Sequence, residues 1–332
     1  MDNKDRIKWI DTAKGIGILL VIIGHTVEDY TIPEFLTRGL IYSFHMPLFF
    51  ILSGITFRQP ENYKYFWNNT RKSFKRLITP VLIVFSIQSI IGLNRITSQD
   101  IGLVDYVVNR IRTLIYSSGV AIHSINVEAL GMTWFLVALF LSKLLYSLIG
   151  LIIKNKYMKL LTIIICNLIG VIISEHYYLP LVLDLVLVIQ LYLDIGVRLQ
   201  KVDMKHNSIL QCTICVLLWL FIWFLSASFT LNYTEMASRR YILFLLNYII
   251  EYCGTLFVCY LCICIDRFRI TKVLNYLGRN SMTLFCVHSI EESIIQIWNI
   301  SDIWYINIII RLIFDLCVFA ILMRLRDKYS KL

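Results

Sequence analysis

The sequence contains little charge for its length. Only 16% of its 332 residues are Asp, Glu, Lys or Arg, whereas 58% are hydrophobic, and the mean hydropathy is +0.70. This balance excludes an ordinary soluble domain. Apolar runs recur along the chain, and each is close to the roughly 20 residues that a helix needs to cross a bilayer. The composition therefore predicts an all-α, polytopic membrane protein.

The sequence also lacks internal repeats and low-complexity linkers, and we expect no secretory signal peptide. The polar opening "MDNKDRIKW" leads directly into the first apolar run without a small-residue cleavage site. We therefore expect one membrane-embedded domain over residues 1–332. Its ten predicted transmembrane helices are 13–29, 38–57, 78–94, 133–153, 158–174, 179–198, 209–229, 242–265, 281–298 and 303–323.

Two long segments, 58–77 and 95–132, lie between predicted spans. The first is expected as a loop on the inner side and the second on the outer side. Within the second, Val107, Ile111 and Leu114 follow helical spacing. This pattern predicts a helix that either lies on the outer membrane surface or caps a cavity.

No cysteine pattern typical of a metal site or a disulfide framework is present. All nine cysteines fall inside predicted spans, and no second pair or histidine stands in register with the short spacings "CTIC" and "CYLCIC". Cysteines in such positions behave as small hydrophobic residues. The nine are Cys166, Cys212, Cys215, Cys253, Cys259, Cys262, Cys264, Cys286 and Cys317.

The net charge of +10 is explained by membrane topology. By the ten-helix segmentation, 24 of the 32 Lys and Arg residues fall on one side of the membrane. The positive-inside rule places that side, and with it both termini, in the cytoplasm. We therefore expect a multi-pass protein of the plasma membrane, with the lipid bilayer as its surroundings and no nucleic acid as a partner.

The first predicted span carries a polar stripe. In a helix, the offset of eleven positions from Lys14 to His25 brings both side chains to nearly the same face, about 16 Å apart along the axis. Lys14 then lies near the inner end and His25 about one turn from the outer end. His45 enters the second span at a similar depth. Polar groups in hydrocarbon are costly and usually functional, although each histidine could instead be a packing residue.

Five segments resemble the acyltransferase 3 family of membrane acyltransferases, and within it the fucose-4-O-acetylase-like group. The family is marked by a basic residue, ten intervening positions and a histidine, which here are Lys14 and His25. The resemblance covers nearly the whole chain. Its segments are "WIDTAKGIGILLVIIGH", "FHMPLFFILSGITF", "RKSFKRLITP", "GMTWFLVALF" and "LGRNSMTLFCVH".

This resemblance implies transfer of an acetyl or other short acyl group from cytoplasmic acyl-CoA to a hydroxyl of a surface or extracellular carbohydrate. Lys14 would meet coenzyme A phosphates as a point charge. His25 would accept the proton of the attacking hydroxyl, or alternatively carry the acyl group itself. His45 would support His25. Acetyl-CoA is the expected donor, a glycan the acceptor, and glycan-assembly proteins possible partners; no metal is expected.

Further candidates each have a structural alternative. The cationic cluster of 71–76 suits coenzyme A phosphates, but inner-side anchoring predicts it equally. On the predicted outer side, an aromatic residue and three charged residues suit contact with an acceptor. An interfacial aromatic belt and solvated surface charges would place the same residue types there. The donor candidates are Arg71, Lys72, Lys75 and Arg76, and the acceptor candidates are Trp134, Glu128, Arg239 and Arg240.

Several polar residues remain inside predicted spans. Arg311 and Asp315 stand four positions apart and are expected to neutralise each other. No partner is assignable from sequence to Asp184, Glu251, His288 or Glu291, and we interpret His288 as structural.

A transporter or exporter is the rival functional class. It is disfavoured because the sequence shows neither inverted repeats nor paired Gly/Pro-broken spans.

Overall fold

The computed structural model confirms the all-α fold class. In the part of the chain that it describes, every extended regular element is a helix, and only two isolated β-bridges, Ile122 with Val127 and Glu235 with Arg240, accompany them. The chain divides into two compact units: 1–52, 203–234 and 242–332 form the first, and 53–202 with 235–241 the second. The described residues are 7–27, 32–94, 102–202, parts of 210–221, 235–241, 245–266, 268–295 and 303–329.

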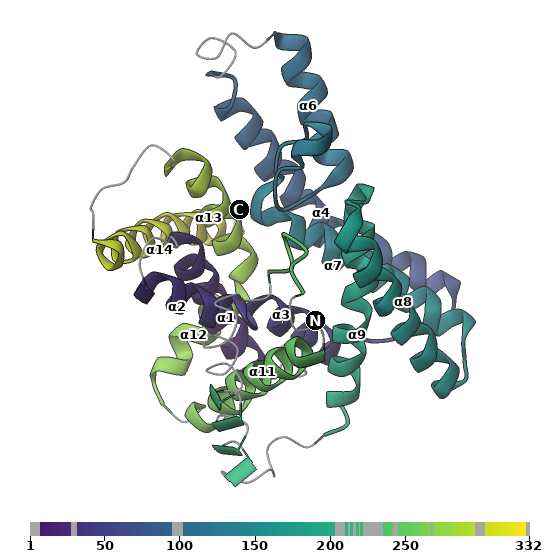
Figure 1. Cartoon of the computed structure of the whole chain (residues 1–332). Helices are drawn as coiled ribbons and strands as arrows, with labels where there is room; N and C mark the ends of the chain where they lie inside the picture. Colours follow the sequence, from purple (N-terminus) through teal and green to yellow (C-terminus); the bar gives the residue numbers. More distant parts are fainter. Residues whose placement is uncertain are drawn as a thin grey trace. The chain divides into compact units, whose positions relative to one another are not determined.

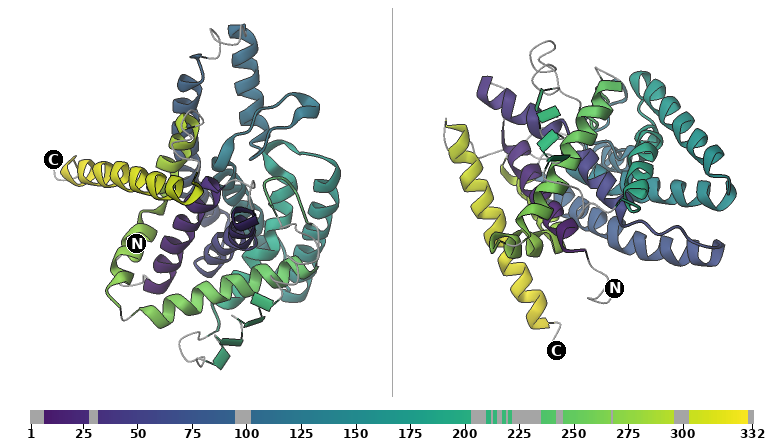
Figure 2. Two further views of the ribbon diagram at one scale, coloured as in Figure 1. Left: turned by 60° about the vertical axis from the view of Figure 1, so that its left-hand side comes forward. Right: turned by 90° about the horizontal axis from the view of Figure 1, so that it is seen from below.

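The first unit is organised around its N-terminal helix, α1. This helix packs against α2, α11, α12, α13 and α14 (Figures 1 and 2). Its central position buries most of the apolar residues that made it a predicted span. The helices of this unit are α1 (Lys8–Thr26), α2 (Ile32–Tyr42), the start of α3 (His45–Ile55), α11 (Leu245–Ile265), α12 (Ile270–Arg279), α13 (Ser281–Ile295) and α14 (Trp304–Tyr329).

The tightest crossing in this unit joins α1 to α12. A side chain at Gly15 would clash with the carbonyl of Leu274, and one at Gly278 would clash with the carbonyl of Asp11. Asn275 Nδ2 also donates to the carbonyl of Lys8 at 3.0 Å. Because the two backbones are this close, residues at the end of α12 are held beside the first turns of α1.

The second unit is a bundle in which α4 packs on α7, α7 on α9, and α8 on α9. Asn62 and Asn155 cap α4 and α8 by accepting backbone N–H groups of the first turn. Gln200 Nε2 donates to the carbonyls of Gly54 and Phe57 at 2.8 and 2.7 Å. Its helices are α4 (Tyr63–Ile91), α6 (Leu103–Tyr116), α7 (Trp134–Ile152), α8 (Lys156–His176) and α9 (Leu183–Leu199).

Among the described residues, eight helices are long and apolar enough to cross a membrane. They overlap eight of the ten predicted spans. Most of the predicted span 209–229 lies outside the described residues. α13 covers residues 281–295 of the predicted span 281–298, and the remainder of that span is outside the described part. The chain is a polytopic membrane protein; the cytoplasmic placement of its termini stays a prediction.

The segment 58–77, predicted as a loop, is mostly helical, and that prediction was wrong. α4 begins at Tyr63, inside the predicted loop 58–77, and at 29 residues it is about 43 Å long, more than the bilayer core requires. Its exposed, Lys/Arg-rich first half lacks the apolar signal of a span but continues the same helix. The stretch 266–280, which lies between two predicted spans, is also mostly helical: it contains α12, whose buried side packs on α1.

Two other details refine the prediction. The helix predicted within 95–132 is confirmed as α6, with Val107 and Ile111 exposed. The second predicted span, 38–57, is broken by a turn at Ser43 and Phe44 into α2 and α3. This break places His45 at the first position of α3.

Candidate active site

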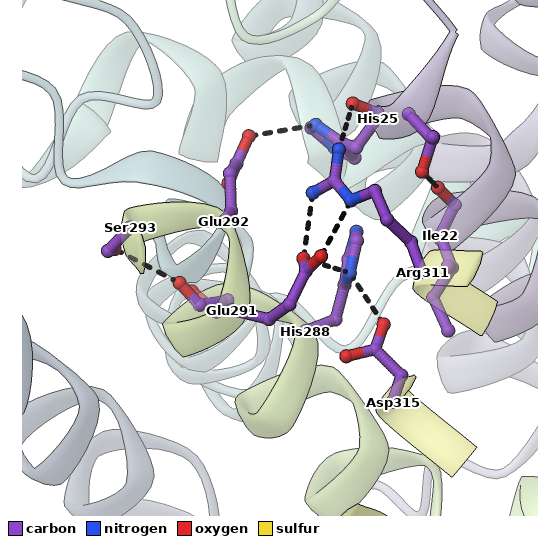
Figure 3. A network of polar contacts seen from close by, with 10 residues as sticks. Ile22, His25, His288, Glu291, Glu292, Ser293, Arg311 and Asp315 are labelled. Carbon is purple, nitrogen blue, oxygen red and sulfur yellow. Dashed lines mark hydrogen bonds and ion pairs between the residues drawn. The ribbon is translucent and has the colours of Figure 1, made fainter. Parts of the chain in front are cut away.

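His25 lies in the last turn of α1 and faces a carboxylate from α13 (Figure 3). Its Nδ1 is 3.6 Å from Glu292 Oε1, and the two side chains keep 26% and 34% of their surface exposed. The His25 ring also lies 5.9 Å from the Tyr42 ring and 6.2 Å from the His288 ring. A partly open imidazole that faces a carboxylate through one nitrogen has the arrangement of an oriented base.

Beneath this pair lies a buried network of charged side chains from α13 and α14. His288 Nδ1 is 2.8 Å from Asp315 Oδ2 and 3.2 Å from Glu291 Oε2. Arg311 donates to both oxygens of Glu291 at 2.7 Å and to the carbonyl of His25 at 3.4 Å. Figure 3 shows that Arg311 thereby joins the end of α1 to α13.

This network corrects two interpretations made from sequence. Arg311 was expected to pair with Asp315, but its guanidinium binds Glu291 instead. His288 and Glu291 had no partner assignable from sequence. In the structure they lie beside each other, and α14 supplies Asp315 to His288 and Arg311 to Glu291. The i,i+4 spacing was misleading because the partner that a buried charge finds is decided by packing between helices.

The same side chains are the group that could hold a metal ion in the described part of the chain. Ligand atoms of His288, Glu291 and Asp315 lie within 4.8 Å of one another, and all three residues are buried. However, Arg311 already occupies both Glu291 oxygens. A divalent ion would have to compete with this two-bond ion pair for the Glu291 carboxylate.

His45 is buried beside the ring that contacts His25. Its Nδ1 lies 3.0 Å from the carbonyl of Ile41, and its ring lies 4.7 Å from that of Tyr42. The guanidinium of Arg38 lies over the Tyr42 ring, 4.9 Å from its centre. Tyr42 therefore lies within ring-contact distance of both His25 and His45. The sequence had not indicated Tyr42 as a candidate.

Lys14 lies toward the other end of α1, about 16 Å from His25 along the helix. Its Nζ is 3.8 Å from Asp11 Oδ1. Arg279, the last residue of α12, approaches the second oxygen of the same carboxylate, with its Nε 3.6 Å from Oδ2. Sequence reasoning had not linked Arg279 to Lys14, because 264 intervening positions separate them in the chain.

The remaining candidates belong to the second unit. The residues of the cationic cluster, Arg71, Lys72, Lys75 and Arg76, are exposed on α4. Arg240 is exposed beside its β-bridge to Glu235.

Two of the acceptor candidates, Trp134 and Glu128, are engaged by neighbouring groups. Trp134 is buried and packs so closely on Gly119 that no side chain fits there. Glu128 accepts from Arg110 at 3.2 Å. Each of these side chains has a structural partner that the sequence did not reveal.

Arg239, predicted to meet an acceptor, is instead buried. It donates to Asp184 at 2.9 Å and to Ser118 at 3.2 Å, and lies 4.3 Å from the centre of the Tyr178 ring. Asp184, which had no partner in the sequence, is therefore neutralised by Arg239. This arrangement disfavours acceptor binding by Arg239, because its charge is already matched.

Comparison with known proteins identifies the family. A family model described as an acyltransferase domain, acyltransferase 3, matches residues 7–323. No curated protein and no solved structure matches the sequence significantly. The match covers both units and includes the His25 site as well as the Lys14 end of α1. The chain therefore belongs to the acyltransferase 3 family of membrane-bound acyltransferases.

Proposed function

We propose that the protein is an O-acyltransferase that moves an acetyl or other short acyl group from cytoplasmic acyl-CoA to a hydroxyl of a surface carbohydrate. The observation that carries this proposal is the His25–Glu292 pair at one end of α1, with the Lys14 cation at the other end. The family supplies the reaction class, acyl transfer. The helix geometry supports a donor that enters from one side and an acceptor that enters from the other.

In this proposal His25 is the general base. Glu292 faces Nδ1, so a proton on that nitrogen leaves Nε2 as the acceptor. A hydroxyl is a weak nucleophile near neutral pH, and removal of its proton during attack accelerates the reaction about 10²–10⁴-fold. The hydroxyl oxygen bonds to the acyl carbon, the carbon–sulfur bond breaks, and the His25 proton passes to the departing sulfur. Glu292 stabilises the imidazolium between these two transfers.

The other candidates take supporting roles. His45, through Tyr42, orients the site or polarises the thioester carbonyl. Lys14 binds coenzyme A phosphates as a cation, and the exposed cations of α4, Arg71, Lys72, Lys75 and Arg76, are a second donor-binding candidate. Glu128 and Arg240 stay candidates for contact with the acceptor. Trp134 and Arg239 are packed and paired, which favours a structural role for both.

The test uses acetyl-CoA labelled in its acetyl group, incubated with membranes that contain the wild type or His25→Ala. We expect label to move to a carbohydrate acceptor in the wild type and to fall by at least about a hundredfold in His25→Ala. Label that stays on the wild-type protein without acceptor would indicate an acyl-histidine instead of general-base catalysis. Uptake or export of a glycan without covalent labelling would contradict the proposal and favour a transporter.

A further inference from the structure

Three charged side chains meet where α12 ends beside the first turns of α1. The carboxylate of Asp11 is buried, whereas Lys14 keeps 23% and Arg279 37% of its side-chain surface exposed. The two cations approach different oxygens of one carboxylate, at 3.8 and 3.6 Å. Both distances exceed the usual hydrogen-bond length of about 2.7–3.2 Å. The cations are thus attracted to Asp11 without being held in a short, fixed geometry by it.

Two cations converge on one carboxylate at a partly exposed position. Such a cluster is suited to a phosphate, because a guanidinium offers a planar fork of donors and an ammonium a compact point charge. Asp11 then acts as the counter-ion that the phosphate competes with.

The backbone beneath the cluster is rigid. Gly278, next to Arg279, and Gly15, next to Lys14, allow α1 and α12 to touch at the backbone. Arg326 of α14 donates to the side chain of Asn280, the residue after Arg279, at 2.9 Å. The two cations therefore stand on elements that cannot separate without breaking this packing, as a preorganised binding site requires.

We propose that Arg279 and Lys14 together bind a phosphate group of the coenzyme A donor. This inference rests on the proposed function for the identity of the ligand. A bilayer phospholipid carries the same chemistry, and the donor is favoured because Lys14 shares one helix face with the proposed base, His25. The competing structural explanation is that Arg279 only stabilises the C-terminus of α12 through the helix dipole.

The first test measures binding directly, so that it does not depend on catalysis. Coenzyme A and pantetheine, which lacks all the phosphates, are titrated against the purified full-length protein by equilibrium dialysis. Arg279→Gln should weaken coenzyme A binding by about two- to fivefold, the range for a partly exposed ion pair, and leave pantetheine binding unchanged. Arg279→Lys should keep part of the affinity. Lys272→Gln, an exposed cation on the same helix, is the matched control and should have no effect.

The second test removes the negative charge of Asp11 and asks whether coenzyme A binds more tightly or more weakly. If Asp11 competes with the phosphate, Asp11→Asn should tighten coenzyme A binding. If the cluster is only structural, the same change should loosen Lys14 and Arg279 and weaken binding or leave it unchanged.

The outcomes separate this inference from the proposed function. Equal coenzyme A affinity for the wild type and Arg279→Gln, or equal losses for coenzyme A and pantetheine, would overturn the phosphate site while leaving acyl transfer untouched. A loss of coenzyme A affinity that occurs only in bilayers with anionic phospholipid, and not in neutral detergent, would assign the site to lipid and also overturn it. Phosphate-dependent binding in a protein that transfers no acyl group would support the site and contradict the function.

Discussion

Replacement of Glu292 by glutamine tests whether the carboxylate acts on His25. Glutamine keeps the shape and an acceptor oxygen but removes the negative charge that faces Nδ1 at 3.6 Å. At that distance, two unit charges attract by about 4.6 kcal/mol at an effective dielectric constant of about 20 and by about 1.2 kcal/mol in bulk water. The side chains are 26% and 34% exposed, so we expect the lower part of this range, about 1–3 kcal/mol. At about 1.36 kcal/mol per decade, kcat should fall about 5- to 150-fold.

The assay is the initial rate of acyl transfer from labelled acetyl-CoA, measured with purified Glu292→Gln and with Glu175→Gln, an exposed carboxylate at the end of α8, as the control. The Michaelis constant for the donor should change little, because Glu292 acts on the base and not on the donor. In a His25→Ala background, Glu292→Gln should have no further effect. A rate within about twofold of the wild type, or an additive loss in the double variant, would refute the idea that Glu292 works through His25.

Four further predictions follow from other contacts. His45→Gln should reduce kcat at least about tenfold without changing donor affinity, and an unchanged rate would make His45 a packing residue. Lys14→Arg should keep most activity, whereas Lys14→Met should weaken acyl-CoA binding about tenfold; equal dissociation constants would remove Lys14 from the donor site. Arg311→Lys keeps the charge but not the fork that spans two helices, so kcat should fall about ten- to hundredfold at constant donor Michaelis constant, whereas a parallel loss of folded protein would indicate structure alone. Arg239→Met leaves the Asp184 carboxylate buried without its cation and should destabilise the protein by about 3–5 kcal/mol, measured by thermal unfolding in detergent; an unchanged midpoint would show that the pair is dispensable.

Much of the fold follows from properties that are local in the sequence. Apolar runs of the required length mark eight spans, because each helix satisfies its own backbone and needs only an apolar surface to lie in lipid. The helix α6 was also predictable, since its apolar residues repeat with helical spacing. The start of α4 was not, because its polar half carries no hydrophobic signal and yet continues the same helix.

The chain by itself also determined that Lys14 and His25 share one helix, since helical spacing puts both on the same face of α1. Only the tertiary structure decided which groups surround them. Glu292 reaches His25 and Arg279 reaches Asp11 because helices that are distant in the chain pack side by side, and Arg311 reaches Glu291 across two successive helices. Spacing within one helix specifies neighbours at three and four positions, but a buried charge pairs with whichever opposite charge the packing brings within reach.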